Sequence, residues 1–326
     1  MRDPKKLSQL ERDGVVSRDS SGNLIIDAAK LPLADTSTQV LKPVVEEISL
    51  PEEPVKRGRK KKMVEVQRGV GLDIGTSFIV AGRFNEEGEV SFKSFRDAFF
   101  PLEPKTEINK QMMKKGLDSR GAVYIEKDGK FFVLGEDAFL MANERHENTR
   151  RPLSQGVISP KEKEALPILK EIIARLLGKP KDKGETVVFS VPGKPIDAEF
   201  DQIFHQNVLK SIITELGYSA QPMNEAEAVA YSELLDNDLT GISLSFGAGQ
   251  VNVAVLSSGE TVVAFSTTKS GDYIDHSVAL ATNMTDSIVQ QEKENGVDLM
   301  NPGSSMIAQA IAVYYGNLMV YTLEQI

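Results

Sequence analysis

The chain has 326 residues, of which 40% are hydrophobic and 26% are charged, a composition typical of globular proteins and long enough for two packed cores. It contains no cysteine, which excludes disulfides and thiolate metal sites, and its three scattered histidines argue against a zinc site. We find no signal sequence and no transmembrane segment of about 20 apolar residues, so we expect a soluble, cytoplasmic protein. The net charge of −9 argues against a folded part that binds nucleic acids in general.

Residues 1–66 form a polar region with spaced prolines and no sustained periodicity, which predicts a disordered tail. It ends in a basic run, residues 56–62, with six positive charges in seven residues. The Arg-Gly-Arg core of this run suits an A·T-rich minor groove of DNA. The run also suits an anionic membrane surface, and it could equally be a solvated linker.

The next element is a predicted hairpin that begins at Val70 and returns along the apolar stretch after Ser77. Gly75 lets the backbone approach a phosphate closely, and Thr76 and Ser77 can donate hydrogen bonds to its oxygens. Asp73, at the end of the first strand, suits Mg²⁺, because that ion prefers carboxylates and keeps several waters. The same pattern also closes ordinary hairpins.

The middle of the chain alternates between strands and helices. The expected elements, in chain order, are a hairpin over 123–134, a helix after Ser159, a strand over 186–191, an amphipathic helix over 197–216 and a helix that begins at Asn224. The apolar face of the helix over 197–216 would consist of Phe200, Ile203, Phe204, Ile212, Ile213 and Leu216.

A second glycine-containing hairpin is predicted over residues 242–256, with Ser245 and Gln250 flanking its turn. The turn at 270–275 opens another helix, which we expect to continue to about residue 290. Residues 306–326 read as an apolar helix.

Six motifs in order over residues 70–275 resemble the superfamily of actin, sugar kinases and heat-shock chaperone ATPases, and most closely the MreB family of bacterial rod-shape actins. The segments that carry the resemblance are 73–77, 135–138, 151–158, 190–192 with 224–225, 245–250 and 270–272. The resemblance implies an α/β fold of two related, ribonuclease H-like lobes with a nucleotide cleft between them. The first lobe would be residues 67–239, with a small outer subdomain at about 101–134, and the second would be 240–326. The segment that usually closes the second lobe in this superfamily is not recognised in the sequence, so we expect an incomplete second lobe.

The resemblance also implies roles for individual residues. Asp73 would hold Mg²⁺ and contribute to catalysis, and Glu225 would orient the attacking water. The residues implied to bind ATP are Gly75, Thr76, Ser77, Ser245, Gly247, Gly249, Gln250, Gly271, Asp272, Glu292 and Lys293. Two alternatives stay open: Asn224 and Glu225 could simply start a helix, and residues 290–299 could be a charged helix end.

The resemblance also leads us to expect a particular activity. The family's second phosphate loop usually begins with Asp, and Ser245 stands there in this chain, so ATP hydrolysis would be weaker. We expect an ATP-binding, Mg-dependent, actin-like protein that assembles into cytoskeletal filaments. The alternatives are a nucleotide-binding scaffold without efficient hydrolysis and a chaperone-type ATPase.

Overall fold

The computed structural model describes residues 16–18, 24–26, 69–85, 88–199 and 202–326. The chain divides into two compact units, Met1–Met63 and Val64–Ile326. In the first unit, the strands β1 (Val16–Arg18) and β2 (Leu24–Ile26) pair in antiparallel fashion, where the sequence predicted no element. Their β-branched residues Val16, Ile25 and Ile26 favour extended backbone. The basic run 56–62 lies outside the described residues.

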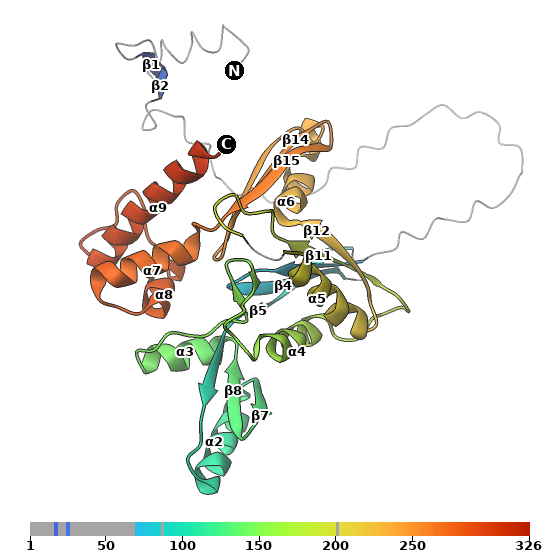
Figure 1. The fold of residues 1–326 in the computed structure, drawn as a ribbon, viewed down its shortest axis with the longest axis vertical. Coiled ribbons are helices and arrows are strands. Elements are labelled where there is room, and N and C mark those ends of the chain that lie inside the picture. The colour runs from blue at the N-terminus through green and yellow to red at the C-terminus, as the bar shows by residue number, and fades with distance from the viewer. Residues whose placement is uncertain (1–15, 19–23, 27–68, 86–87, 200–201) are drawn as a thin grey trace, which may run out of the picture. The chain divides into compact units, whose positions relative to one another are not determined.

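The second unit is built on a five-stranded sheet with the order β12-β11-β3-β4-β5. Its strands are β3 (Val70–Ile74), β4 (Phe78–Phe84), β5 (Val90–Arg96), β11 (Thr186–Val191) and β12 (Ser219–Asn224) (Figure 1). The strands β3, β11 and β12 run parallel, whereas β3, β4 and β5 form the antiparallel meander that the first hairpin predicted. Parallel strands end at the same edge, so the ends of β3 and β11 bring Asp73 and Ser190 together.

One face of this sheet packs on the helices α4 (Ala165–Leu177) and α5 (Gln202–Glu215) around a core that includes Leu72, Ile79 and Phe189. The predicted buried face of α5 is confirmed at Ile212 and Ile213 and wrong at Ile203 and Phe204, which are 74% and 50% exposed. Phe200 lies outside the described residues. The residues of α5 that are buried are His205, Leu209, Ile212 and Ile213. Their spacing of i, i+4, i+7 and i+8 defines a helical stripe, of which the predicted apolar face contained Ile212 and Ile213 but not His205 or Leu209.

Residues 99–158 contain a three-stranded sheet in the order β6-β8-β7. Its elements are β6 (Phe99–Leu102), α2 (Glu107–Arg120), β7 (Tyr124–Lys127), β8 (Lys130–Leu134) and α3 (Glu136–Glu144), followed by the short pair β9 (Leu153–Ser154) and β10 (Val157–Ile158). The predicted hairpin is confirmed. Helix α2 was not predicted, because Leu117 is its one buried residue and its remaining sequence is largely polar.

The C-terminal part has an antiparallel sheet in the order β13-β14-β15, flanked by helices. Its elements are α6 (Glu225–Glu233), the 3-10 turn η2 (Leu235–Asn237), β13 (Gly241–Phe246), β14 (Val251–Ser257), β15 (Glu260–Thr267), α7 (Gly271–Thr282), α8 (Asp286–Glu294) and α9 (Met306–Glu324). The single helix expected from 270–275 to about 290 is wrong. The chain leaves α7 at Asn283, whose φ of 56° is left-handed, and starts α8 after the cap Thr285.

Helix α9 packs on α7 and α8 through Ile311 and Leu318 (Figure 1). Among the described residues it is the one helix that is long and apolar enough to cross a membrane, judged by length and composition alone, with a mean hydropathy of 1.2. The expectation that no stretch of the chain has this length and apolarity is therefore wrong at α9. Met306, Val313 and Leu323 of this helix are each at least 60% exposed.

Candidate functional site

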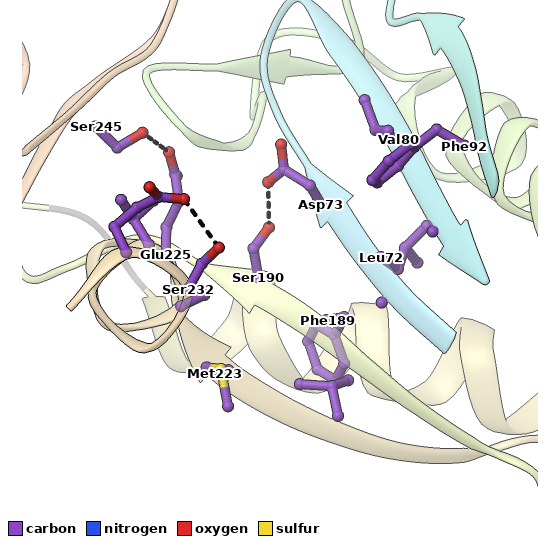
Figure 2. A pocket seen from close by; sticks show the side chains of 16 residues that line it. Leu72, Asp73, Val80, Phe92, Phe189, Ser190, Met223, Glu225, Ser232 and Ser245 are labelled. Atoms are coloured by element: carbon purple, nitrogen blue, oxygen red, sulfur yellow. Dashed lines mark hydrogen bonds between the residues drawn. The ribbon is translucent and has the colours of Figure 1, made fainter. Parts of the chain in front are cut away.

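A cavity of about 460 Å³ lies against the sheet on the side away from α4 and α5, and Figure 2 shows its lining residues. Its walls are mostly apolar and come from β4, β5, β11, β12 and α6; they include Val80, Phe92, Val188, Met223 and Val229. Its polar groups include Asp73, Ser190, Glu225 and Ser245, which come from four different elements. The volume falls in the range of small-molecule sites.

Asp73 lies at the carboxyl end of β3, beside β11. The Ser190 hydroxyl donates to Asp73 Oδ1 over 2.8 Å and accepts a bond from the Ile74 amide over 2.7 Å (Figure 2). Burial raises the pKa of the Asp73 carboxyl, and the Ser190 hydrogen bond opposes that shift. Among the described residues, Oδ2 of Asp73 has no hydrogen-bond partner, so this oxygen is available to a ligand.

Glu225 is the first residue of α6, after the cap Asn224, whose side chain accepts bonds from the amides of residues 226 and 227. The capping role predicted for Asn224 is therefore confirmed. The Glu225 carboxylate accepts one bond from the Ser245 hydroxyl over 2.6 Å (Figure 2). It accepts another from Asn252 Nδ2 over 2.9 Å. Burial raises the pKa of Glu225 to about 7; the Ser245 bond lowers it and the charge of Asp73 raises it further. A carboxylate with this pKa can accept a proton near neutral pH.

The two glycine hairpins meet in the structure. The Thr76 hydroxyl accepts a bond from the Gly156 amide over 3.1 Å, and a Cβ on Gly249 would lie only 2.2 Å from the Thr76 hydroxyl oxygen. Position 249 therefore tolerates only glycine in this arrangement. Gln250 Nε2 donates to the carbonyl of Gln155 over 2.7 Å, which brings the segment 151–158 against both hairpins.

Gly75 closes the first hairpin by donating its amide to the Phe78 carbonyl over 3.1 Å. A Cβ at this position would lie 2.7 Å from that same carbonyl oxygen. Glycine is therefore required here by the close approach of two backbone segments, independent of any ligand.

The start of α7 packs on the second hairpin. The amide of Gly271 donates to the carbonyl of Gly247 over 3.0 Å, and the amide of Asp272 donates to that of Ala248 over 2.8 Å. The Asp272 carboxylate pairs with Arg151 over 2.9 Å, which connects α7 to the segment that follows α3. The predicted residues of the second hairpin and of the 270–272 turn thus form one cluster.

Of the two residues predicted on α8, Lys293 contacts this cluster and Glu292 does not. Lys293 pairs with Asp275 over 2.7 Å and donates to the carbonyl of Gly271 over 3.1 Å. Glu292 is exposed and contacts no other predicted site residue within the described part of the chain. The residue of α8 that reaches the first hairpin is Gln290, whose Nε2 lies 3.0 Å from the Ser77 hydroxyl oxygen.

Four residues in these contacts were not singled out as site residues from the sequence: Ser190, Asn252, Arg151 and Gln290. Ser190 could have been found, because it ends a predicted buried strand and strand ends in α/β sheets gather at one edge. Arg151 belongs to a motif noted in the sequence but has no partner nearby in the chain.

The carboxylates are too few to hold a metal ion without other ligands. No group of three or more His, Cys, Asp or Glu side chains among the described residues could do so. Mg²⁺ commonly takes one or two protein carboxylates and completes its shell with waters and phosphate oxygens. The unpartnered Oδ2 of Asp73 fits that pattern, and Asp73 is the residue that would hold the ion.

Asp97 is a fully buried carboxyl behind the first hairpin, where its amide donates to the Ser77 carbonyl over 2.8 Å. Its Oδ2 accepts a bond from the Leu153 amide over 3.2 Å, while Oδ1 is buried without a partner. Burial raises its pKa to about 8; the Leu153 bond and the charge of Arg151 lower it. Burial therefore favours the neutral form of this carboxyl in the folded protein.

We expect Asp97→Asn to stabilise the protein at alkaline pH. The folded pKa of about 8 exceeds the ordinary 3.8, so the folded state binds more protons and loses stability as pH rises between those values. The Tm of the variant should exceed that of wild type by roughly 4 °C or more at pH 8.5, and by much less at pH 5. Calorimetric melting at both values tests this, and an equal difference at both would show that Asp97 does not titrate in this way.

Comparison with known proteins identifies a family and a fold. The family described as volactin matches residues 69–326. A structure titled as a MamK double helical filament is similar over 78% of this chain and 77% of that chain, with 19% identity and a TM-score of 0.55. A structure of MreB5 of Spiroplasma citri bound to AMPPNP is similar over 80% of this chain and 78% of that chain, with 16% identity and a TM-score of 0.54. The search of curated proteins found no match. The fold is therefore actin-like, as the sequence motifs predicted.

Proposed function

The chain belongs to the volactin family, and we propose that it is an actin-like protein that binds ATP with Mg²⁺, hydrolyses it slowly and assembles into cytoskeletal filaments. The observation that carries this proposal is the convergence of Asp73, Glu225 and Ser245 on one pocket beside two touching glycine hairpins. The fold shared with MreB5 and MamK supports the placement of nucleotide near these hairpins.

The phosphates would lie beside the turns 75–77 and 247–250, where the glycines place no bulky side chain in the way. The amides of Gly75 and Gly247 already donate to the carbonyls of Phe78 and Gln250, so they hold the turns in shape. Mg²⁺, when bound at Asp73, would neutralise the charge that develops on the phosphates. Glu225 would orient a water and accept its proton, and its pKa of about 7 suits that task.

The Ser245 hydroxyl supports slow hydrolysis in this proposal. It donates to Glu225 over 2.6 Å, so it occupies one oxygen of the base, and the Asn252 amide occupies the other. A hydrogen bond to the charged form also lowers the basicity of the carboxylate. The same contacts favour the second candidate, a scaffold that binds nucleotide and does not turn it over.

We expect the full-length protein to form filaments when Mg·ATP is added and to depolymerise or stay monomeric without nucleotide. High-speed pelleting and negative-stain microscopy would measure this, with Gly249→Val as the site variant, since its side chain would force the two hairpins apart. Gly116→Val, at a position of α2 with open space around it, is the matched control. Wild-type protein that stays in the supernatant with every nucleotide would contradict the filament proposal.

A further inference from the structure

The Gln290 side chain links α8 to the first hairpin. It is 8% exposed, and its Nε2 donates to the Ser77 hydroxyl over 3.0 Å and to Glu294 Oε1 over 2.8 Å. Glu294 is itself fixed by Arg96, whose Nη1 and Nη2 donate to its two oxygens over 3.0 and 2.6 Å. The amide of Gln290 is therefore held between a carboxylate and a hydroxyl.

Two aromatic rings and a second carboxylate also contact the Arg96 side chain. Its guanidinium lies 4.5 Å from the ring centre of Phe78 and 4.1 Å from that of Phe139, and its Nε donates to Glu136 over 2.7 Å. Cation–π contacts of a desolvated guanidinium stabilise such a placement. Glu294 thus has little freedom to turn, and neither has the glutamine that donates to it.

These contacts fix the direction of the hydrogen bond at Ser77. A carboxylate only accepts, so the group of Gln290 that faces Glu294 must be the amide nitrogen, which only donates. The same nitrogen faces Ser77, whose hydroxyl oxygen must then accept. A hydroxyl that accepts this bond keeps its own proton for another partner.

We propose that Gln290 is a positioning residue that sets the polarity of the Ser77 hydroxyl, so that its proton is directed to a phosphate oxygen of the bound nucleotide. This inference rests on the proposed ATP binding and deepens it, because it assigns a role to a residue of the second lobe in the phosphate loop of the first. Nucleotide phosphates and the position of α8 would then be energetically coupled through one hydrogen bond.

The test reverses the polarity of that bond. The ionised carboxylate of Gln290→Glu has the same shape as the amide but only accepts, so the Ser77 proton would turn toward it and away from the phosphate. ADP should bind about tenfold more weakly, the expected loss of one hydrogen bond to a charged group, while adenosine binding should change less than twofold. Isothermal calorimetry of the full-length protein with Mg·ADP and with adenosine measures both.

The Ser77→Ala background separates this effect from charge repulsion. There, Gln290→Glu should weaken ADP less than threefold, because no hydroxyl is left to reorient. Gln290→Met, which cannot accept, should also weaken ADP less than threefold. Gln291→Met is the matched control on the same helix, since Gln291 contacts Asn143 instead of Ser77.

The inference would be overturned if Gln290→Glu weakened ADP binding equally with and without the Ser77 hydroxyl. A tenfold loss of ADP affinity in Gln290→Met would also overturn it, as would a loss of adenosine affinity in Gln290→Glu equal to the loss of ADP affinity. Wild-type protein that binds neither ADP nor ATP is a different outcome, because it overturns the proposed nucleotide binding itself. Circular dichroism of each variant verifies that it is folded before its affinity is compared.

Discussion

Replacing Glu225 by Gln should lower the single-turnover rate of ATP hydrolysis by about 100-fold or more, the usual range for loss of a general base. Glutamine keeps the shape of the side chain and can still accept the Ser245 bond, but it cannot take a proton from water. The affinity for Mg·ATP should stay within about threefold, because the lost interaction acts mainly in the transition state. Rapid-mixing assays with excess enzyme measure the rate directly.

The pH profile gives an independent check on Glu225. A base must be deprotonated to act, so the wild-type rate should rise as pH increases through about 7, the pKa of this carboxyl. Glu227→Gln, two residues along α6, is the matched control and should leave rate and profile unchanged. If Glu225→Gln hydrolysed ATP at the wild-type rate, Glu225 would not be the general base.

Replacing Asp73 by Asn should weaken the binding of Mg·ATP by about tenfold to 100-fold. The amide can still accept the Ser190 bond, but it carries no charge for Mg²⁺, which prefers carboxylate ligands. With EDTA present, wild type and variant should bind ATP with similar, low affinity. Titrations with and without magnesium measure both values.

Glu233→Gln is the control for Asp73→Asn, because Glu233 also lines the pocket and its carboxylate accepts only from Ser232, over 3.0 Å, among the described residues. That change removes a negative charge from the same pocket without touching β3, and it should leave the magnesium dependence intact. If Asp73→Asn weakened ATP binding as much in EDTA as in the presence of magnesium, Asp73 would act on the structure of the pocket instead of on the ion.

The two glycine hairpins could be predicted because their signals are local. An apolar strand, a glycine turn and a second apolar strand lie within about 15 residues of each other in both cases. The same holds for the helix start at Asn224, whose side chain caps the amides of residues 226 and 227, within three positions of it. Helix α2 was not predicted, because Leu117 is its one buried residue and its sequence has no wide apolar stripe.

The partners of the site residues could not be predicted, because they come from distant parts of the chain. Ser190 reaches Asp73 through the parallel pairing of β11 with β3, and Gln290 of α8 reaches Ser77 across a sequence separation of 213 residues. Because we expected one long helix from 270–275 to about residue 290, we did not predict the contact between Gln290 and Ser77. Asp97 gives no local sequence signal either, since its raised pKa follows from complete burial.

Equilibrium binding of Mg·ATP to the full-length protein tests the central claim most directly. Isothermal calorimetry should show saturable binding of one nucleotide per chain, weakened by Asp73→Asn and by Gly249→Val and unchanged by Glu233→Gln and Gly116→Val. Absence of saturable heat with ATP, ADP and magnesium, in protein that melts cooperatively, would contradict the assignment of the pocket and hairpins to a nucleotide.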